Sequence, residues 1–302
     1  MQANISEELN WNYSLEPNYR LLLVKGEDSE RFLQGQLTQD VVKLPQNKAQ
    51  WCSACNYQGR VASSSLILRT LNGFALLLPS SIAELEMNRL KRYILRSKVT
   101  MEISDLSICY ARLPLTDIKA DYPNLPSDDM QVYVDESCIL VRLPCLPADE
   151  DAIRCLIIKK DNADVSRVST SNQLSRDLLL QGIALIEASE TLKWLPQALN
   201  LDLIGAVARN KGCYTGQEVI NKTQTLARIK RRMFLGEIDS PVVNQSEIMC
   251  DGTPVGNVVL SNQQRFLYVL DWEFENKTLT LNDQIIQNIP LPYLVNIPKS
   301  AI

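Results

Sequence analysis

The sequence of 302 residues contains no histidine. A Ser-His-Asp triad, a Cys-His pair and a zinc site built on two histidines are therefore all excluded. Any general acid or base must be an aspartate, glutamate, lysine, tyrosine or cysteine. We accordingly do not expect a hydrolase that uses a cysteine nucleophile.

Long hydrophobic runs are absent as well. The longest, ALLLP and DLLLQGIALI, are far shorter than a membrane span, and the first residues, MQANISEELNW, lack the apolar stretch of a secretory signal. We therefore expect a cytoplasmic protein whose eight cysteines stay reduced and mostly fill the core. The chain has no excess of positive charge either: its net charge of −4 disfavours a general nucleic-acid binder but leaves room for a local basic patch.

What the sequence does contain is 45% apolar residues, enough for a large core and for more than one domain. The pattern predicts a strand at 19–26 and then a short helix within 27–41. This helix should begin near Asp28 and bury Phe32, Leu33 and Leu37. A hairpin is expected at 63–79, with Asn72-Gly73 supplying a type I′ turn.

Hydrophobic periodicity predicts three more helices, within residues 81–95, 149–160 and 171–182. The first should be capped by Ser81 and should bury one stripe: Ile82, Leu85, Leu90, Tyr93 and Ile94. The last should end at Gly182. Strands are expected between 99 and 143, interrupted by a Pro- and Asp-rich loop at 121–129.

After residue 230 almost every segment has the composition of a strand, with turn residues between the segments. We therefore expect an α+β fold that ends in a small β-barrel. The predicted division is an α+β region at 1–232 and a barrel at 233–302.

The segment NKGCYTGQEV, residues 210–219, holds one cysteine between a lysine and a tyrosine. Thr215 and Glu218 have the spacing of a capping box, in which each side chain accepts a hydrogen bond from the other residue's amide. A helix should then begin at Thr215. Its N-terminus and the ammonium of Lys211 would both stabilise a thiolate at Cys213.

The two glycines of this segment, Gly212 and Gly216, permit close approach of a ligand or of another stretch of backbone. From the residues alone, Cys213 is a nucleophile, a metal ligand or a small apolar filler in a tight loop. These three alternatives stay open at this point.

Two further features have a possible function and a simpler structural explanation. Cys52 and Cys55 form a lone C-x-x-C, but residues three apart on a strand face opposite ways, so shared metal or redox chemistry is not expected. In ARIKRRM, alternation along a strand would place Arg228, Lys230 and Arg232 on one face. That face could seat a polyglutamate tail or an RNA phosphate, although a solvated strand edge is the commoner role of such a run.

The motif KGCYTGQE resembles the signature of the YgfZ family, folate-binding proteins related to the glycine-cleavage aminomethyltransferase and implicated in iron–sulfur protein maintenance and tRNA modification. Other segments resemble the family in the same order along the chain: GEDSERFLQGQLTQDV, NYQGR, WLPQALNLDLIGAV, RIKRRMFLGEI and GTPVGNVV. The resemblance thus touches both ends and the middle of the sequence.

The resemblance implies a ring of α+β subdomains around an opening for the pteridine of tetrahydrofolate, followed by the barrel. The candidate site residues that it implies are Gln36, Thr38, Asp40, Arg60, Lys211, Gly212, Cys213, Tyr214, Gly216, Gln217 and Glu218. Asp40 or Glu218 would accept from the pterin, and Tyr19 or Tyr214 would stack on it. For Asp40 a helix-end cap is an equal alternative, and the capping box competes for Glu218.

One departure from the aminomethyltransferases concerns the reaction itself: Leu180 stands in LLQG where those enzymes have the acid of a LEAG-like stretch. An aromatic residue before Leu178 is also missing. The sequence therefore predicts a folate-binding accessory protein without turnover of its own, which supports iron–sulfur proteins such as tRNA-modifying radical enzymes. The alternatives are a folate-dependent aminomethyl or one-carbon transferase and an RNA-binding module acting on tRNA.

Overall fold

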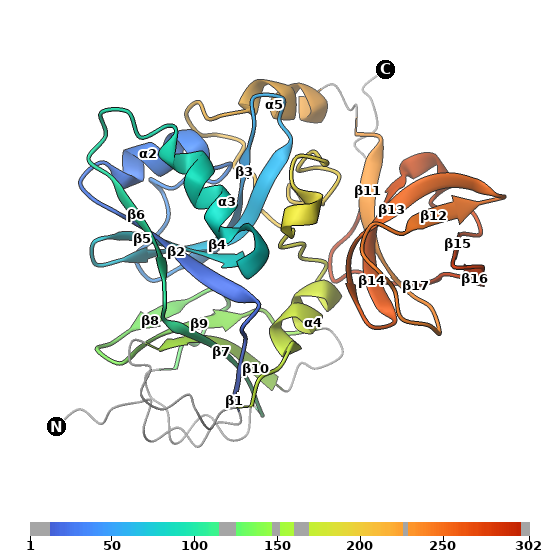
Figure 1. The fold of residues 1–302 in the computed structure, drawn as a ribbon, viewed down its shortest axis with the longest axis horizontal. Helices are drawn as coiled ribbons and strands as arrows, with labels where there is room; N and C mark the ends of the chain where they lie inside the picture. Colours follow the sequence, from blue (N-terminus) through green and yellow to red (C-terminus); the bar gives the residue numbers. More distant parts are fainter. Residues whose placement is uncertain (1–12, 115–124, 147–151, 160–168, 226–228, 297–302) are drawn as a thin grey trace. The chain divides into compact units, whose positions relative to one another are not determined.

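The computed structural model describes residues 13–114, 125–146, 152–159, 169–225 and 229–296 (Figure 1). They belong to two compact units, each assembled from separate stretches of chain. Unit 1 comprises Met1–Phe32, Val42–Gln50 and Leu66–Leu174, and unit 2 comprises Leu33–Val41, Trp51–Ser65 and Ser175–Ile302. The predicted division at residues 232 and 233 remains a prediction.

Unit 1 contains an antiparallel five-stranded sheet in the order β1-β7-β10-β9-β8. Its strands are β1 (Tyr13–Leu15), β7 (Ser107–Pro114), β8 (Val132–Val134), β9 (Cys138–Leu143) and β10 (Ala152–Lys159). Buried hydrophobic side chains, including those of Cys109, Cys138 and Cys155, pack together on one face of this sheet. The expectation that most cysteines fill the core is confirmed, because six of the eight are buried and all are free thiols.

The helix predicted at 149–160 is wrong, since β10 occupies that segment. All eight residues of β10 are buried, and β7 and β9 pair with it on its two sides. A central strand covered on both faces has no polar side, so its composition resembles that of a buried helix.

The second ladder of unit 1 has β2 (Tyr19–Lys25) between β5 (Gly73–Pro79) and β6 (Thr100–Ser104), with the end of β4 (Val61–Thr70) beyond β5. The predicted strand 19–26 and the hairpin are confirmed. The hairpin loop is Leu71 and Asn72, however, because Thr70 already pairs with Gly73. Gly73 has φ +148°, and a Cβ there would lie 2.1 Å from the carbonyl oxygen of Val24.

Helix α3 (Ser80–Lys91) follows β5 directly, so its N-cap is Pro79 and not the predicted Ser81. Ile82 and Leu90 are buried as expected, whereas Leu85 and Tyr93 are exposed. The buried stripe includes Glu86 instead, whose carboxylate receives two hydrogen bonds of 2.8 Å from Arg89. A paired glutamate thus occupies a position where the pattern predicted only apolar residues.

Helix α2 (Ser29–Gln36) begins close to the predicted position, and Phe32, Leu33 and Leu37 are buried as expected. The first half of β4 and β3 (Ala49–Cys55) are neighbours in a sheet. Three helices follow later in the chain: α4 (Gln173–Leu180), the 3-10 helix η3 (Ala188–Glu190) and α5 (Gln217–Thr225). Gly182, at φ +66°, ends α4 as predicted.

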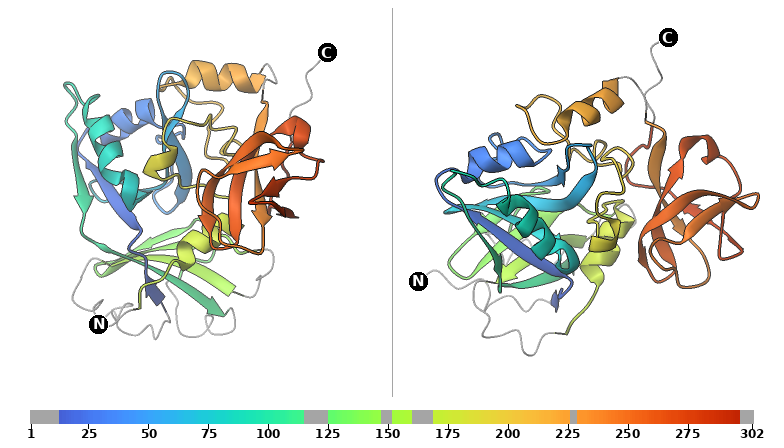
Figure 2. Two further views of the ribbon diagram at one scale, coloured as in Figure 1. Left: turned by 45° about the vertical axis from the view of Figure 1, so that its right-hand side comes forward. Right: turned by 45° about the horizontal axis from the view of Figure 1, so that its top comes forward.

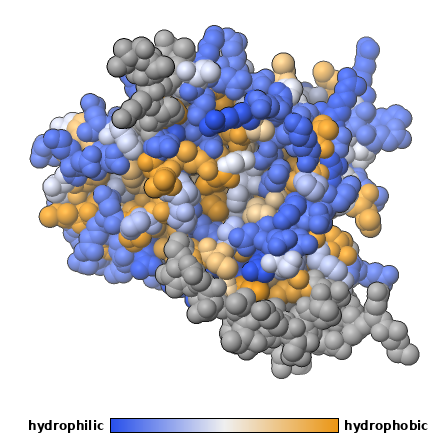
Figure 3. Space-filling view, turned by 180° about the vertical axis from the view of Figure 1, so that it is seen from behind, coloured by the Kyte–Doolittle hydropathy of each residue, from blue (hydrophilic) through white to orange (hydrophobic). Residues whose placement is uncertain are grey.

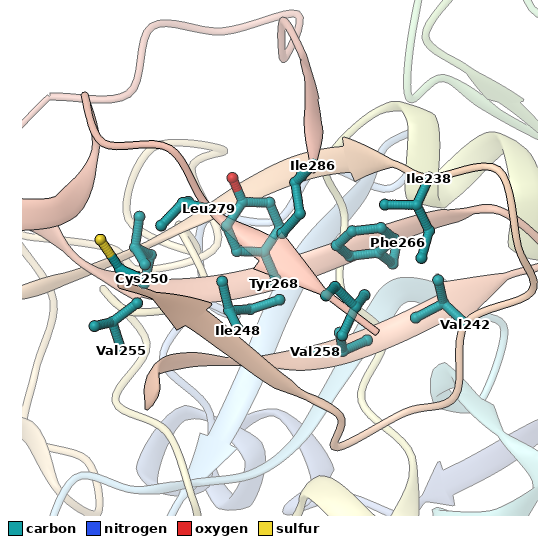
Figure 4. Packing of buried hydrophobic residues seen from close by; sticks show 12 residues of the cluster. Ile238, Val242, Ile248, Cys250, Val255, Val258, Phe266, Tyr268, Leu279 and Ile286 are labelled. Atoms are coloured by element: carbon teal, nitrogen blue, oxygen red, sulfur yellow. The ribbon is translucent and has the colours of Figure 1, made fainter. Parts of the chain in front are cut away.

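The C-terminal strands of unit 2 form a nearly closed seven-stranded barrel in the order β16-β15-β12-β13-β14-β11-β17 (Figures 1 and 2). The strands are β11 (Arg231–Glu237), β12 (Glu247–Cys250), β13 (Thr253–Asn262), β14 (Arg265–Asp271), β15 (Thr280–Leu281), β16 (Gln284–Ile285) and β17 (Gln287–Ile289), with the 3-10 helix η4 (Trp272–Phe274) after β14. Figure 4 shows the barrel interior, where Phe266 and Tyr268 pack among aliphatic side chains. The predicted barrel is confirmed.

In the parts of the chain that the structure describes, no helix is both long and apolar enough to cross a membrane. On the face shown in Figure 3, hydrophobic side chains lie in patches between hydrophilic ones. Several large hydrophobic side chains are exposed, including Tyr57, Leu71 and Leu95. Most are single residues of turns and loops, which is ordinary for a protein surface.

Candidate functional site

The loop that carries Cys213 is anchored to the end of α2 by Lys211. The Lys211 ammonium donates three hydrogen bonds to backbone carbonyl oxygens, to Gln34 at 2.8 Å, Leu37 at 2.7 Å and Gln39 at 2.7 Å. The last carbonyls of a helix have no partner within the helix, and a cation there also meets the negative end of the helix dipole. Lys211 is therefore a cap for α2, and all three of its donors are used.

The charge state of Lys211 reflects its buried position. Burial lowers the pKa of its ammonium to about 8, while the negative charge of Asp40 acts in the opposite direction. The ammonium also lies 4.8 Å from the ring centroid of Tyr214, within cation–π range. Lys211 thus contacts α2, the residues just after α2 and the Tyr214 ring.

A second anchor is Thr215, whose amide donates to the carbonyl oxygen of Gly35 at 3.1 Å. Its hydroxyl points toward the same oxygen at 3.5 Å. The predicted capping box is therefore wrong: α5 begins at Gln217, and the Glu218 carboxylate pairs with Lys222 at 2.5 Å. The amide and hydroxyl of Thr215 contact α2, and the Glu218 carboxylate contacts Lys222, so the two residues do not cap each other.

A third anchor is the close contact of two glycines from two of the sequence landmarks. Gly216 has φ +85°, and a Cβ on it would lie 2.5 Å from the Asn56 carbonyl oxygen and 3.0 Å from the Cα of Gly59. Gly59, at φ +73°, faces Val219 in turn. The expected close approach at Gly216 is thus an approach to backbone. At Gly212 a Cβ would meet nothing within 4 Å.

Cys213 lies between these anchors and is exposed, together with Gly212. Of the eight cysteines, Cys145 is half-buried and the other six are buried. A buried filler role for Cys213 is therefore wrong. The loop holds a solvent-accessible thiol on a backbone fixed at Lys211, Thr215 and Gly216.

The predicted residues at the end of α2 lie around the Lys211 anchor. Asp40 is buried, and its Oδ1 accepts from Gln34 Nε2 at 3.0 Å. Thr38 is fully buried: its hydroxyl donates to the Ala206 carbonyl oxygen at 2.7 Å and accepts from the Ser53 amide at 3.0 Å. The Thr38 hydroxyl thus serves the protein itself.

Three glutamines lie near this anchor. Gln36 is largely buried, as is Gln39, which sequence reasoning missed. The Gln39 side chain donates to the Gly205 carbonyl oxygen at 2.7 Å and accepts from the Asp40 amide at 2.9 Å. Sequence reasoning also missed Gln34, whose side chain bonds to Asp40 and to the Val41 amide. A glutamine in a helix gives no sequence signal for such contacts.

The remaining signature residues divide between buried and exposed positions. Tyr214 is buried, burial raises the pKa of its phenol, and its hydroxyl has no hydrogen-bond partner in the described structure. Gln217 is partly buried and donates toward the Lys211 carbonyl oxygen at 3.5 Å. Glu218 is exposed on α5, and its ion pair with Lys222 lowers the pKa of its carboxyl.

The remaining predicted residues are Tyr19, Arg60, Arg228 and Arg232. Tyr19 is buried on β2 of unit 1. Arg60 is exposed in unit 2, where its guanidinium donates to the Lys193 carbonyl oxygen. Arg228 lies outside the described residues. The shared basic face is wrong for Arg232, which is fully buried and paired with Asp202 at 2.6 Å.

The two cysteines of the C-x-x-C motif lie on β3 and make separate contacts. Cys52 Sγ lies 3.1 Å from Ser65 Oγ, and Cys55 Sγ lies 4.0 Å from Ser53 Oγ. Among the described residues, no group of three or more Cys, Asp or Glu side chains is arranged to hold a metal ion.

Comparison with known proteins gives relatives in sequence and in fold. No family model matches the chain. The tRNA-modifying protein YgfZ of Shigella boydii serotype 4 (strain Sb227) is 28% identical over 229 residues, which cover 72% of this chain and 69% of the relative. The tRNA-modifying protein YgfZ of Escherichia coli (strain SE11) matches to the same extent.

Among solved structures, the glycine cleavage system aminomethyltransferase T from Bartonella henselae superposes with a TM-score of 0.69. The match covers 92% of this chain and 84% of that one at 15% sequence identity, so it establishes the fold and not the reaction. The resemblance and the fold class expected from the sequence are both confirmed. The chain is therefore a homologue of the YgfZ proteins with the fold of a glycine-cleavage aminomethyltransferase.

Proposed function

We propose that this protein binds a reduced folate, tetrahydrofolate or one of its one-carbon forms, as an accessory factor for iron–sulfur proteins that modify tRNA. The observation that carries the proposal is the exposed thiol of Cys213 on a loop anchored to α2 and to the Asn56–Gly59 turn. The relatives named tRNA-modifying proteins support the connection with tRNA, and the aminomethyltransferase fold supports folate.

The residues around the Lys211 anchor fit a pterin at two points. The Asp40 carboxylate is an acceptor for the ring amino and N–H groups, and the buried Tyr214 hydroxyl lacks a partner within the described structure. In this proposal Thr38 and Glu218 do not contact the pterin, because the Thr38 hydroxyl bonds to the backbone and the exposed Glu218 carboxylate pairs with Lys222. One face of the Tyr214 ring is covered by Lys211, which leaves less of it for stacking.

Because the Cys213 thiol is exposed, it is better placed to contact a second protein than to form a metal site within this chain. A single thiolate does not hold an iron–sulfur cluster, and the described residues offer no group of three metal ligands. In this proposal Cys213 meets a client protein, and the client supplies the remaining cluster ligands. The cysteine is then needed for function but not for folate binding.

The test of folate binding is a titration with tetrahydrofolate followed by tryptophan fluorescence, with and without tRNA. We expect saturable binding, at least tenfold weaker binding for Asp40→Asn, and a change below twofold for the exposed Glu218→Gln. Thermal unfolding of each variant shows whether the fold is retained. Absence of binding to the wild-type protein at millimolar folate, or equal losses in both variants, contradicts the proposal.

The test of the thiol uses cells that lack the protein, with modified tRNA nucleosides measured by mass spectrometry. Cys213→Ser should abolish complementation and retain folate affinity, whereas Cys145→Ser, which changes a half-buried thiol, should complement. Full complementation by Cys213→Ser would show that the thiol is not needed for function.

A second candidate function, aminomethyl or one-carbon transfer, is favoured by the fold match alone. The chain has Leu180, partly buried at the end of α4, where the aminomethyltransferases have an acid. The absence of that carboxylate disfavours aminomethyl transfer. Release of a one-carbon unit from methylene-tetrahydrofolate under turnover conditions would favour this alternative over the accessory role.

A further inference from the structure

A cleft of about 770 Å³ lies within unit 2, and its described lining includes no residue of α2 or of the Cys213 loop. Its lining comes from Arg60 before β4, the segment after η3, α5, the start of β11 and the end of β14 with η4. The side chains that matter for recognition are Arg60, Trp194, Gln197, Lys230 and Trp272. The volume is in the range of small-ligand sites.

Gln197 lines this cleft and carries a buried hydrogen-bond acceptor. The residue is 1% exposed, and its Oε1 has no hydrogen-bond partner in the described structure. The orientation of its amide is fixed, because Nε2 donates to the Ile220 carbonyl oxygen at 3.0 Å. Turning the amide over would bring two acceptor oxygens together. An unpaired buried acceptor is costly, so the site calls for an N–H or O–H donor from a ligand.

Trp272 and Lys230 both line this cleft and are joined by a backbone hydrogen bond. The Trp272 amide donates to the Lys230 carbonyl oxygen at 2.8 Å, which fixes η4 against the residue before β11. The Trp272 ring is partly exposed, and Phe234 stacks on it with ring centroids 6.1 Å apart. A supported indole next to an exposed ammonium is suited to a flat ring that carries negative charge.

The charges that line the cleft favour an anion. Arg231 is paired with Asp271 at 2.7 Å, so these two charges largely cancel. Arg60 and Lys230 remain, against the single carboxylate of Glu273 in the described lining. Both are exposed, and Arg60 uses one N–H on the Lys193 carbonyl oxygen, which leaves further donors. The cleft is thus locally cationic on a chain with a net charge of −4.

We propose that this cleft binds one unpaired nucleotide of a single-stranded RNA segment. The amino group of the base donates to Gln197 Oε1, the base lies against Trp272, and Lys230 and Arg60 contact the phosphate. Base stacking on an aromatic side chain with cations along the backbone is the usual mode of single-strand recognition. Relatives named tRNA-modifying proteins make RNA the favoured source of such a nucleotide. The inference does not depend on folate binding, which the Asp40 variants test separately.

The experiment is fluorescence anisotropy with a labelled hexamer of adenylate, in low salt, on the full chain. Trp272→Leu should weaken binding at least fivefold, since stacking contributes about 1–3 kcal/mol per base. Lys230→Ala should weaken it severalfold and reduce the slope of affinity against salt by about 0.7 for each phosphate that it no longer neutralises. The matched control is Lys277→Ala, an exposed lysine of the same barrel outside this lining, which should leave both unchanged.

The contact with Gln197 has its own test. AMP should compete with the hexamer at least tenfold better than purine riboside monophosphate, which lacks only the exocyclic amino group. Equal competition by the two nucleotides would show that the amino group of the base does not bond to Gln197. Absence of hexamer binding, an equal effect of Lys230→Ala and Lys277→Ala, or displacement by pentaglutamate with no effect of Trp272→Leu would overturn the proposal.

Discussion

At the scale of single residues, Lys211 shows that a lysine beside a candidate nucleophile can serve the backbone instead. Its three hydrogen bonds go to carbonyl oxygens at and beyond the end of α2. The motif KGCYTGQE therefore includes a lysine for a structural reason that its position next to Cys213 does not reveal. Its contribution to stability is measurable.

Lys211→Met should destabilise the protein by about 1–3 kcal/mol, because three carbonyl oxygens lose their charged donor. The gain from removing a buried ammonium, whose pKa burial lowers to about 8, offsets part of this loss. Lys222→Met is the matched control, since Lys222 forms only an exposed pair with Glu218, and its effect should stay within about 0.5 kcal/mol. Denaturant unfolding measures both. Equal effects would mean that the carbonyl contacts contribute nothing.

A second residue with a measurable signature is Glu16 of unit 1. It is 1% exposed, its Oε1 accepts from Ser171 Oγ at 2.8 Å, and burial raises the pKa of its carboxyl. The folded state therefore holds the proton more tightly than the unfolded chain. This contribution to stability is complete below the unfolded pKa of about 4.5 and is lost as the pH rises through the folded value.

The Glu16→Gln variant should thus lose less stability than the wild type between pH 4 and 8, in denaturant unfolding at each pH. The two proteins should differ least at the acid end, where both carry a neutral side chain. Parallel stability curves across this range would show that Glu16 ionises in the folded state as it does in the unfolded chain.

At the scale of elements, the contact of α5 with the Asn56–Gly59 turn depends on one hydrogen atom at Gly216. Gly216→Ala combines a positive φ with a Cβ 2.5 Å from the Asn56 carbonyl oxygen, so we expect destabilisation of about 2 kcal/mol or more. Gly212→Ala, in the same motif, meets nothing within 4 Å and should change stability little. Thermal unfolding compares them, and similar losses would contradict the close approach at Gly216.

Sequence reasoning succeeded where an element has one polar face or a marked end. Helix α4 with Gly182, the strands of the barrel and the hairpin of β4 and β5 are of this kind. It failed at β10, which is buried on both sides, and at Thr215, whose groups are taken by Gly35 of a distant segment. A local sequence pattern does not show which distant residues an element will contact. For the same reason the sequence does not predict that Gln197 Oε1 is buried without a hydrogen-bond partner.

At the scale of the whole molecule, the barrel is tied to the rest of unit 2 by buried polar contacts. Arg232 on β11 is fully buried and pairs with Asp202, while the Asn200 side chain donates to the Met233 carbonyl oxygen at 2.7 Å. These contacts join the barrel strands to residues 175–225, which belong to the same compact unit. The unit should unfold in a single transition.

Asp202→Asn leaves the Arg232 charge buried without its partner and should cost about 3–5 kcal/mol. The neighbouring Arg231–Asp271 pair is partly exposed, so Asp271→Asn should cost less than about 1 kcal/mol. Tryptophan fluorescence and far-ultraviolet circular dichroism should report the same midpoint for each variant. Two separated transitions in Asp202→Asn would show that the barrel is an independent folding unit.

The meeting of Gly216 with Gly59 also bears on the order of events during synthesis. The two glycines lie far apart along the chain, so their contact closes a long loop and forms only after both segments have left the ribosome. Until then the Cys213 segment has neither its glycine contact nor the Lys211 carbonyl contacts. A nascent chain thus exposes an ordinary flexible cysteine, and the anchored thiol appears only when translation has passed α5.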